Sequence, residues 1–298
     1  GGVSSALSMW FDASDFDADG NTGNNIADNT VLTSSGTNMW RDRSPSGNNM
    51  NQVSNITYQS DATNLANWGG NPSVTGASSS YMNTNTRGGF YAGTAYYVHT
   101  VTGGNSNRDS IAMGAGPQLG TYQIIGASNY STGQVYNFQN NVGGDTTITN
   151  DNFYNSAISS VTGAPTIIGV EKNSGQDNMT FNVIKSASAT PTRQTTNIAI
   201  LANANLPYGE FGNAPAIYRY GGEYAGSSAN QFAEIIYYGC TTNGCTANKT
   251  TAEKNKIESY LAIKYGATLR TTTGTGQDYF FLIIRRPPSS TLAGTTYY

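Results

Sequence analysis

Alternating hydrophobic and polar positions dominate the middle and the end of the chain. In the segment from Met179 to Val183, Met179, Phe181 and Val183 face one side of an extended strand, and the polar residues between them face the other. This alternation is typical of a half-buried antiparallel strand. Further short runs of this kind, each bounded by Gly, Asn, Pro or Ser, lie at residues 122–127, 134–138, 166–170, 197–201, 216–220 and 232–238. Many short strands with turn signals between them predict a sandwich or a barrel rather than βαβ units.

Residues 250–266 break this pattern and predict a single amphipathic helix. Thr250 can cap the first turn, and Glu253, three residues on, can reach back to complete a capping box. Gly266 supplies the left-handed residue that ends a helix. The apolar residues of the segment fall on one face at helical spacing: Ile257, Tyr260, Leu261 and Tyr265. We expect this helix to lie against the sheets as a structural element.

The sequence has no repeat of fixed period and is divided into two unequal parts. Residues 1–270 are long enough for one large all-β domain. Residues 271–298 read as a Thr/Gly-rich linker, an apolar strand and a polar tail. Pro287 and Pro288 follow the apolar strand and forbid its continuation as a central strand.

The chain is polar but weakly charged, which limits the classes of partner that it can bind. Only 11% of its 298 residues are charged and its formal net charge is -3. This balance offers neither a basic footprint for nucleic acid nor a polybasic patch for anionic lipid. No stretch approaches the roughly 18 apolar residues that a membrane helix needs. We therefore expect no nucleic-acid partner and no membrane span.

Four segments resemble a known family. They are MWFDASDFDADGN at 9–21, MWRDRSPSGNN at 39–49, AEIIYYG at 233–239 and KIESYLAIKYGATL at 256–269. Together they are similar to the laminin-G-like, concanavalin A-like jelly-roll domains of large secreted bacterial surface proteins and adhesins. The resemblance spans about residues 3 to 270, and its closing block is the most specific part. It implies two curved antiparallel sheets, a secreted or cell-surface location and a role in binding or adhesion, without naming a ligand.

The strongest local motif is the acidic run that begins at Asp15. Asp15, Asp17 and Asp19 stand at alternate positions and are followed by Gly20 and Asn21, so that several oxygen ligands crowd into a tight loop. Hard cations such as calcium prefer such a cluster. The twelfth position of an EF-hand count is an isoleucine, so the bidentate acid of that motif is missing. Two interpretations stay open: a calcium site formed by Asp15, Asp17, Asp19 and Asn21, or an Asx-turn loop that bonds to its own backbone.

Catalysis has less support in the sequence. Retaining glucanases of the concanavalin-type fold carry acids at alternate positions on one strand, because the nucleophile and the acid must lie about 5 Å apart. This chain has no such run, and its candidate acids are isolated: Glu171, Glu210, Glu223 and Glu234. His99 is the only histidine, which argues against both a zinc site and a Ser-His-Asp triad. We therefore expect that the protein is not an enzyme. The alternative is a polysaccharide hydrolase or lyase.

The tryptophans and tyrosines are the candidates for ligand contact, since aromatic faces stack on sugar rings. Trp10 and Trp40 are expected to be core residues beside their loops. The candidates for a binding surface are Trp68, Tyr96 and Tyr97. The partner would be a glycan or a surface protein.

Two further features bear on the environment and on assembly. Cys240 and Cys245 are the only cysteines, and the turn-forming residues between them allow a disulfide worth about 2 kcal/mol, which would fit an oxidising compartment. The alternative is two free thiols. The strand beyond the helix is apolar throughout: Tyr279, Phe280, Phe281, Leu282, Ile283 and Ile284. Such a strand needs cover, either from its own sandwich or by donation to the sheet edge of a neighbouring copy, which would build a filament.

Overall fold

The protein folds into a curved antiparallel sheet with a helix packed on one face. The computed structural model describes residues 2–22, 25–84, 93–102, 109–115, 121–130, 133–142, 153–159, 165–172, 178–185, 193–199, 217–220, 229–239 and 248–267. The strands are β1 (Leu7–Asp12), β2 (Met50–Gln59), β3 (Ser73–Thr84), β4 (Gly93–Thr102), β5 (Asp109–Ala115), β6 (Thr121–Tyr130), β7 (Gly133–Val142), β8 (Phe153–Ser159), β9 (Thr166–Lys172), β10 (Asn178–Lys185), β11 (Arg193–Ala199), β12 (Ile217–Tyr220) and β13 (Ala229–Gly239).

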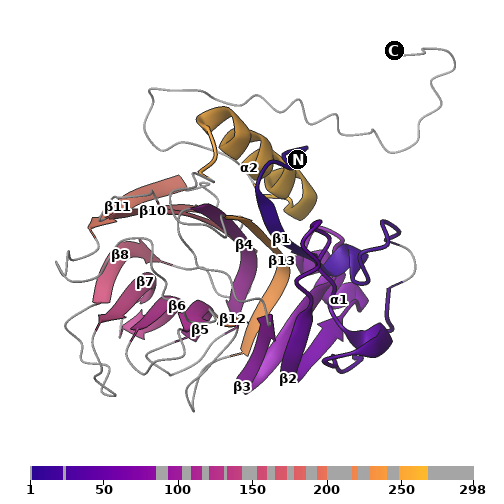
Figure 1. Ribbon diagram of the computed structural model, residues 1–298. Helices are drawn as coiled ribbons and strands as arrows, with labels where there is room; N and C mark the ends of the chain where they lie inside the picture. Colours follow the sequence, from indigo (N-terminus) through magenta and orange to yellow (C-terminus); the bar gives the residue numbers. More distant parts are fainter. Residues whose placement is uncertain are drawn as a thin grey trace, which may run out of the picture.

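The strands form one hydrogen-bonded path that bends into two layers. Its order is β11-β10-β9-β4-β13-β3-β12-β5-β6-β7-β8, with β1 paired to β13 and β2 paired to β3. In Figure 1 the layer of β5 to β8 lies opposite β10 and β11, and the path between the two layers runs through β4, β13, β3 and β12. The expected all-β sandwich is thus confirmed, with the difference that the two layers belong to one continuous sheet. The curvature follows from the right-handed twist that accumulates from strand to strand.

The predicted helix is present with both of its predicted ends. It is α2 (Thr251–Tyr265), and Thr250 is its N-cap. The Thr250 hydroxyl accepts a hydrogen bond from the Glu253 amide at 3.2 Å, while the Glu253 carboxylate accepts one from the Thr250 amide at 2.9 Å. Gly266 ends the helix with a φ of 66°. Local signals therefore specify this element before any tertiary contact forms.

Two hydrophobic clusters lie on opposite faces of the sheet, one of them beneath α2. Side chains of β13 alternate between them: Ile235 and Tyr237 belong to the first, and Ile236 and Tyr238 to the second. The register of β13 against β4 shifts between Phe232 and Glu234, which indicates a bulge. The extra residue interrupts the alternation, so that Ala233 and Glu234 both lie on the side of α2.

A short segment between β2 and β3 holds the C-terminal end of α2. Helix α1 (Ala62–Asn67) ends at Trp68, which is 1% exposed and packs edge-on against Tyr265, with ring centroids 6.4 Å apart. The Asn71 side-chain amide donates to the carbonyl of Lys264 at 2.8 Å. This satisfies one of the carbonyls that a helix end leaves unpaired. The sequence pattern did not predict α1 or this contact.

Several predicted features lie outside the described residues. These are both cysteines, the linker, the apolar strand of residues 279–284 and the polar tail. Within the described ranges, no helix is long and apolar enough to cross a membrane.

Candidate functional site

The most concentrated chemistry in the described residues is a polar network where β1, β13 and α2 meet. At its centre is Glu234, which is 0% exposed. One carboxylate oxygen accepts from the Trp10 indole at 2.7 Å. The other accepts from Lys264 Nζ at 2.9 Å, from the Tyr265 hydroxyl at 2.9 Å and from the Tyr260 hydroxyl at 3.3 Å. Four donors thus occupy both oxygens of one buried acid.

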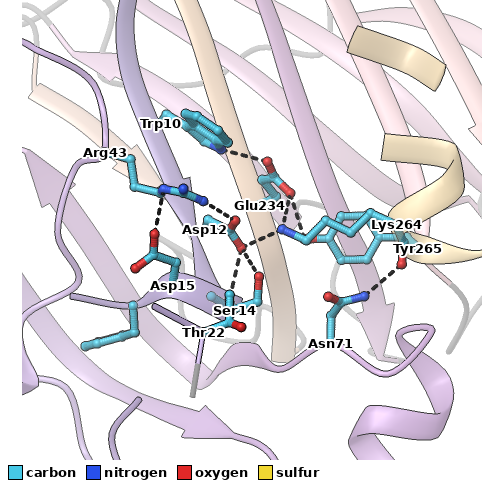
Figure 2. A network of polar contacts seen from close by, with 12 residues as sticks. Trp10, Asp12, Ser14, Asp15, Thr22, Arg43, Asn71, Glu234, Lys264 and Tyr265 are labelled. Carbon is cyan, nitrogen blue, oxygen red and sulfur yellow. Dashed lines mark hydrogen bonds and ion pairs between the residues drawn. The ribbon is translucent and has the colours of Figure 1, made fainter. Parts of the chain in front are cut away.

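Asp12, at the end of β1, is the second buried acid of the network. Its Oδ1 accepts from Lys264 Nζ at 2.7 Å and from the Ser14 hydroxyl at 2.6 Å. Its Oδ2 accepts from Arg43 Nη1 at 2.7 Å. Arg43 also pairs through Nε with Asp15 Oδ2 at 2.9 Å and lies over the Trp10 ring. Figure 2 shows the resulting chain of contacts, which runs from the acidic loop through Arg43 and Asp12 to Lys264 and Glu234.

The two buried acids have pKa values displaced in opposite directions. Burial raises the pKa of Glu234, and the Lys264 charge and the hydrogen bonds offset only part of that rise. Burial alone would also raise the pKa of Asp12, but the Lys264 charge together with hydrogen bonds from Lys264 and Ser14 outweighs it, so that pKa lies below its usual range. Asp12 is therefore held as the carboxylate, and Glu234 is the group that more readily holds a proton.

The acidic loop adjoins this network through Asp15. Asp15, Asp17 and Asp19 place carboxylate oxygens within 4.8 Å of one another, and the three residues are buried, half-buried and exposed in turn. Asp15 accepts from the Gly20 amide at 3.1 Å and 3.2 Å, and Asp19 accepts from the Asn21 amide at 2.7 Å. The buried Asp17 Oδ1 has no hydrogen-bond partner among the described residues. The loop thus combines backbone-bonded acids with one oxygen that no donor satisfies.

The loop at residues 42–48 also belongs to this site region. The sequence alone predicted no role for its side chains. The Asp42 carboxylate accepts from the amides of Trp10, Ser44 and Asn48 at 2.8, 2.8 and 2.7 Å. Ser44 and Asn48 also donate from their side chains to the carbonyl of Ser8. These bonds cover the outer edge of β1, which would otherwise present free backbone groups for pairing.

The three aromatic candidates for ligand contact are not at the surface. Trp68 and Tyr96 are each 1% exposed and Tyr97 is 4% exposed. Trp68 and Tyr96 belong to the hydrophobic cluster beneath α2, and Tyr97 belongs to the opposite cluster. Their burial corrects the expectation that these rings offer a stacking surface. The sequence did not reveal that both faces of β4 are covered at Tyr96 and Tyr97.

The remaining sequence candidates have ordinary structural positions. Trp40 is fully buried, as expected, whereas Trp10 is only half-buried and covers part of the polar network. His99 is fully buried, and burial lowers its pKa to about 3. Glu171 forms an ion pair with Lys254 of α2. Glu210 and Glu223 lie outside the described residues.

Comparison with known proteins adds little beyond the fold. A family described as a domain of unknown function, DUF8202, matches residues 253–281, which include most of α2. No curated protein matches the chain. Among solved structures, the chain is similar to domain 4 of AbnA, a GH43 extracellular arabinanase from Geobacillus stearothermophilus, with 11% identity, coverage of 79% of this chain and 94% of that one, and a TM-score of 0.42.

Two other similar structures are a GH54 α-L-arabinofuranosidase and a lectin. The arabinofuranosidase has 14% identity, coverage of 78% of this chain and 51% of that one, and a TM-score of 0.47. The acidic lectin of winged bean, complexed with methyl-α-D-galactose, has 8% identity, coverage of 61% and 91%, and a TM-score of 0.38. At these values no activity or ligand is carried over to this chain. The fold class rests on the strand pairing described above.

Proposed function

We propose that the chain is an extracellular binding or structural module of a cell surface and not an enzyme. The observation that carries this proposal is the state of Glu234, whose oxygens accept from four internal donors in a fully buried position. Glycoside hydrolysis needs two acids that flank the scissile bond, about 5 Å or more apart, with substrate between them. Here Lys264 occupies the space between Asp12 and Glu234. The low charge and the resemblance of the first and last blocks to surface domains support the same function.

The expected partner is a glycan or a surface protein. A glycan array tests the first, and a pull-down from surface extracts of the source cells tests the second. Binding in either experiment, together with a surface location, supports the proposal. If the protein binds neither class and is not at the surface, the proposal is wrong.

The enzyme alternative, a polysaccharide hydrolase or lyase of the same fold, has its own test. Glu171 and Glu234 are the described candidates for its acid, and both have internal partners. We expect no turnover of a polysaccharide panel. Turnover that disappears in Glu171→Gln or Glu234→Gln would replace our proposal by the enzyme.

We further propose that the acidic loop binds calcium. Three carboxylates meet there, and Arg43 forms an ion pair with one of them, Asp15. The unsatisfied Asp17 Oδ1 supports a cation in place of a hydrogen-bond donor, because a buried anionic oxygen without a partner is unfavourable. Oxygen ligands at alternate positions of a tight loop suit calcium.

Removal of calcium is expected to lower the melting temperature, and its return to restore it. A ligand at one hundred times its Kd stabilises the native state by about 2.7 kcal/mol. Calorimetry with a chelator, with calcium and with magnesium at equal ionic strength measures the effect. Asp17→Asn should abolish the response to calcium. A melting temperature that is unchanged in excess chelator would remove Asp15, Asp17, Asp19 and Asn21 from the site.

We also propose that the C-terminal segment joins copies of the chain into an assembly. The apolar strand that the sequence predicts at residues 279–284 can add to the sheet edge of a neighbouring copy, and a head-to-tail arrangement of this kind does not close. Deletion of residues 277–298 is then expected to leave a soluble, folded monomer, whereas the full chain forms longer assemblies in electron microscopy and light scattering. A misfolded or aggregated deletion product would instead place the strand within its own sandwich.

A further inference from the structure

Lys264 Nζ lies between two carboxylates that come from distant parts of the chain. It is 2.7 Å from Asp12 Oδ1 at the end of β1 and 2.9 Å from Glu234 Oε2 on β13. The two acid side chains are 2% and 0% exposed, and that of Lys264 is 14% exposed. An amine and two carboxyl groups are therefore in contact in a largely buried site (Figure 2).

We propose that Lys264 and Asp12 join in an intramolecular amide bond, with Glu234 as the proton carrier and Arg43 as the group that stabilises the developing oxyanion. The site holds each participant that this condensation needs. Lys264 is the nucleophile and Asp12 Cγ is the electrophile. Glu234 contacts the reacting nitrogen, and Arg43 contacts the carboxylate oxygen that does not leave.

The step balances without any co-reactant. One proton of the Lys264 ammonium moves to Glu234, and the free amine attacks Cγ of the Asp12 carboxylate. The C–N bond forms, and Oδ1 and Oδ2 then each carry negative charge. Arg43 Nη1, 2.7 Å from Oδ2, faces that charge. The bond from Cγ to Oδ1 then breaks, and Oδ1 leaves as water with the proton that Glu234 returns and a second proton from the nitrogen. An ammonium and a carboxylate become an amide and one water, and nothing is oxidised or reduced.

The surroundings of the three groups favour this reaction over a static ion pair. Burial raises the pKa of Glu234, which makes it a better acceptor for the proton of Lys264 than an ordinary carboxylate. The pKa of Asp12 is lowered, against the effect of burial, chiefly by the Lys264 charge, and this cause disappears once the amine is neutral. Because the amine and the carboxyl group are held in contact, the reaction needs no bimolecular encounter. This removes a large part of its activation barrier.

The bond would staple the first strand to the last helix. Its two residues are 252 positions apart, so the cross-link encloses nearly the whole sandwich. This property would suit a structural role outside the cell, but the proposal does not depend on the proposed function, because it needs neither a ligand nor a surface location.

The intact mass of the full chain under denaturing and reducing conditions tests the proposal directly. We expect a mass about 18 Da below that of the sequence, the mass of one water. Digestion should give a branched peptide that joins the segment with Asp12 to the segment with Lys264. Reduction separates this loss from that of a disulfide. A mass equal to that of the sequence, or a lost water that maps elsewhere, overturns the proposal.

Three variants assign the roles. Lys264→Arg removes the nucleophile and should restore the full mass, whereas Lys256→Arg, at an exposed position of the same helix, should keep the loss. Glu234→Gln should also restore the full mass. Retention of the loss in Lys264→Arg overturns the bond, and its retention in Glu234→Gln overturns Glu234 as the proton carrier. If a variant fails to fold, the presence or absence of the branched peptide in the chain without substitutions decides the question.

Discussion

Lys264→Met is expected to lower the free energy of unfolding by about 3 to 5 kcal/mol, because it leaves two buried carboxylates without the cation that lies between them. The carboxylates of Asp12 and Glu234 are almost fully buried, and Lys264 Nζ is within 3 Å of both. Arg43 still contacts Asp12, but no other described cation pairs with Glu234. Loss of an amide bond at Lys264 would act in the same direction.

Denaturant unfolding of Lys264→Met and of a matched control measures this effect. Lys256→Met makes the same substitution on the exposed side of α2, and Met and Lys have similar helix propensities, so we expect a change within about 0.5 kcal/mol. A loss of the same small size in both variants would mean that the network contributes nothing to stability. Equal slopes against denaturant would show that the two variants unfold from comparably compact states.

The predicted elements are those whose signals lie close together in the chain. Alternation located β6, β7, β9, β10, β12, β13 and part of β11, but not β1 to β5 or β8. The cap residues Thr250, Glu253 and Gly266 located both ends of α2, because each signal needs only its own neighbours. The closing helix was therefore correct to within a residue. Helix α1 was missed, although Asp61 caps it by accepting from the amides of Thr63 and Asn64. Its six residues are too few for a hydrophobic period to appear.

The polar network could not be predicted, because its members meet only in the folded chain. Asp12 and Lys264 are 252 positions apart, and no local pattern joins them. Glu234 reads as one isolated acid in an apolar strand. The shift in register between Phe232 and Glu234 turns it toward α2, and simple alternation does not reveal such a shift. The four internal donors to its carboxylate are known only from the fold.

For the acidic loop, the sequence predicted the cluster of carboxylates but not its connection to the rest of the site. The spacing of Asp15, Asp17 and Asp19 correctly indicated that their carboxylates gather at one point. The sequence did not show that Arg43 would pair with Asp15 and connect the loop to Asp12. The proposed cation site and the network beneath α2 therefore share one guanidinium, that of Arg43. The calcium titration should be read together with the stability of the network.

Gly69→Ala is expected to destabilise the protein by about 3 kcal/mol, from two causes that its neighbour Gly70 separates. Gly69 has a φ of +65°, and an added Cβ would lie 3.1 Å from the Lys264 carbonyl oxygen and 3.1 Å from the Tyr265 carbonyl carbon. Gly70 has a φ of +89°, and a Cβ there meets nothing within 4 Å. A left-handed backbone disfavours alanine by about 1 to 2 kcal/mol at either position, and overpacking against α2 adds about 1 to 3 kcal/mol at Gly69 alone.

The difference between Gly69→Ala and Gly70→Ala therefore measures how closely the loop after α1 presses on the end of α2. The colliding atoms belong to the backbone of Lys264 and Tyr265, so unless the loop yields, relief of the contact moves the residues that hold Glu234. We expect Gly69→Ala to lower the melting temperature clearly more than Gly70→Ala, and to shift the near-ultraviolet circular dichroism of the aromatic residues around the network. Equal melting temperatures would mean that the loop yields freely, and that α2 is held by the polar network without the support of this loop.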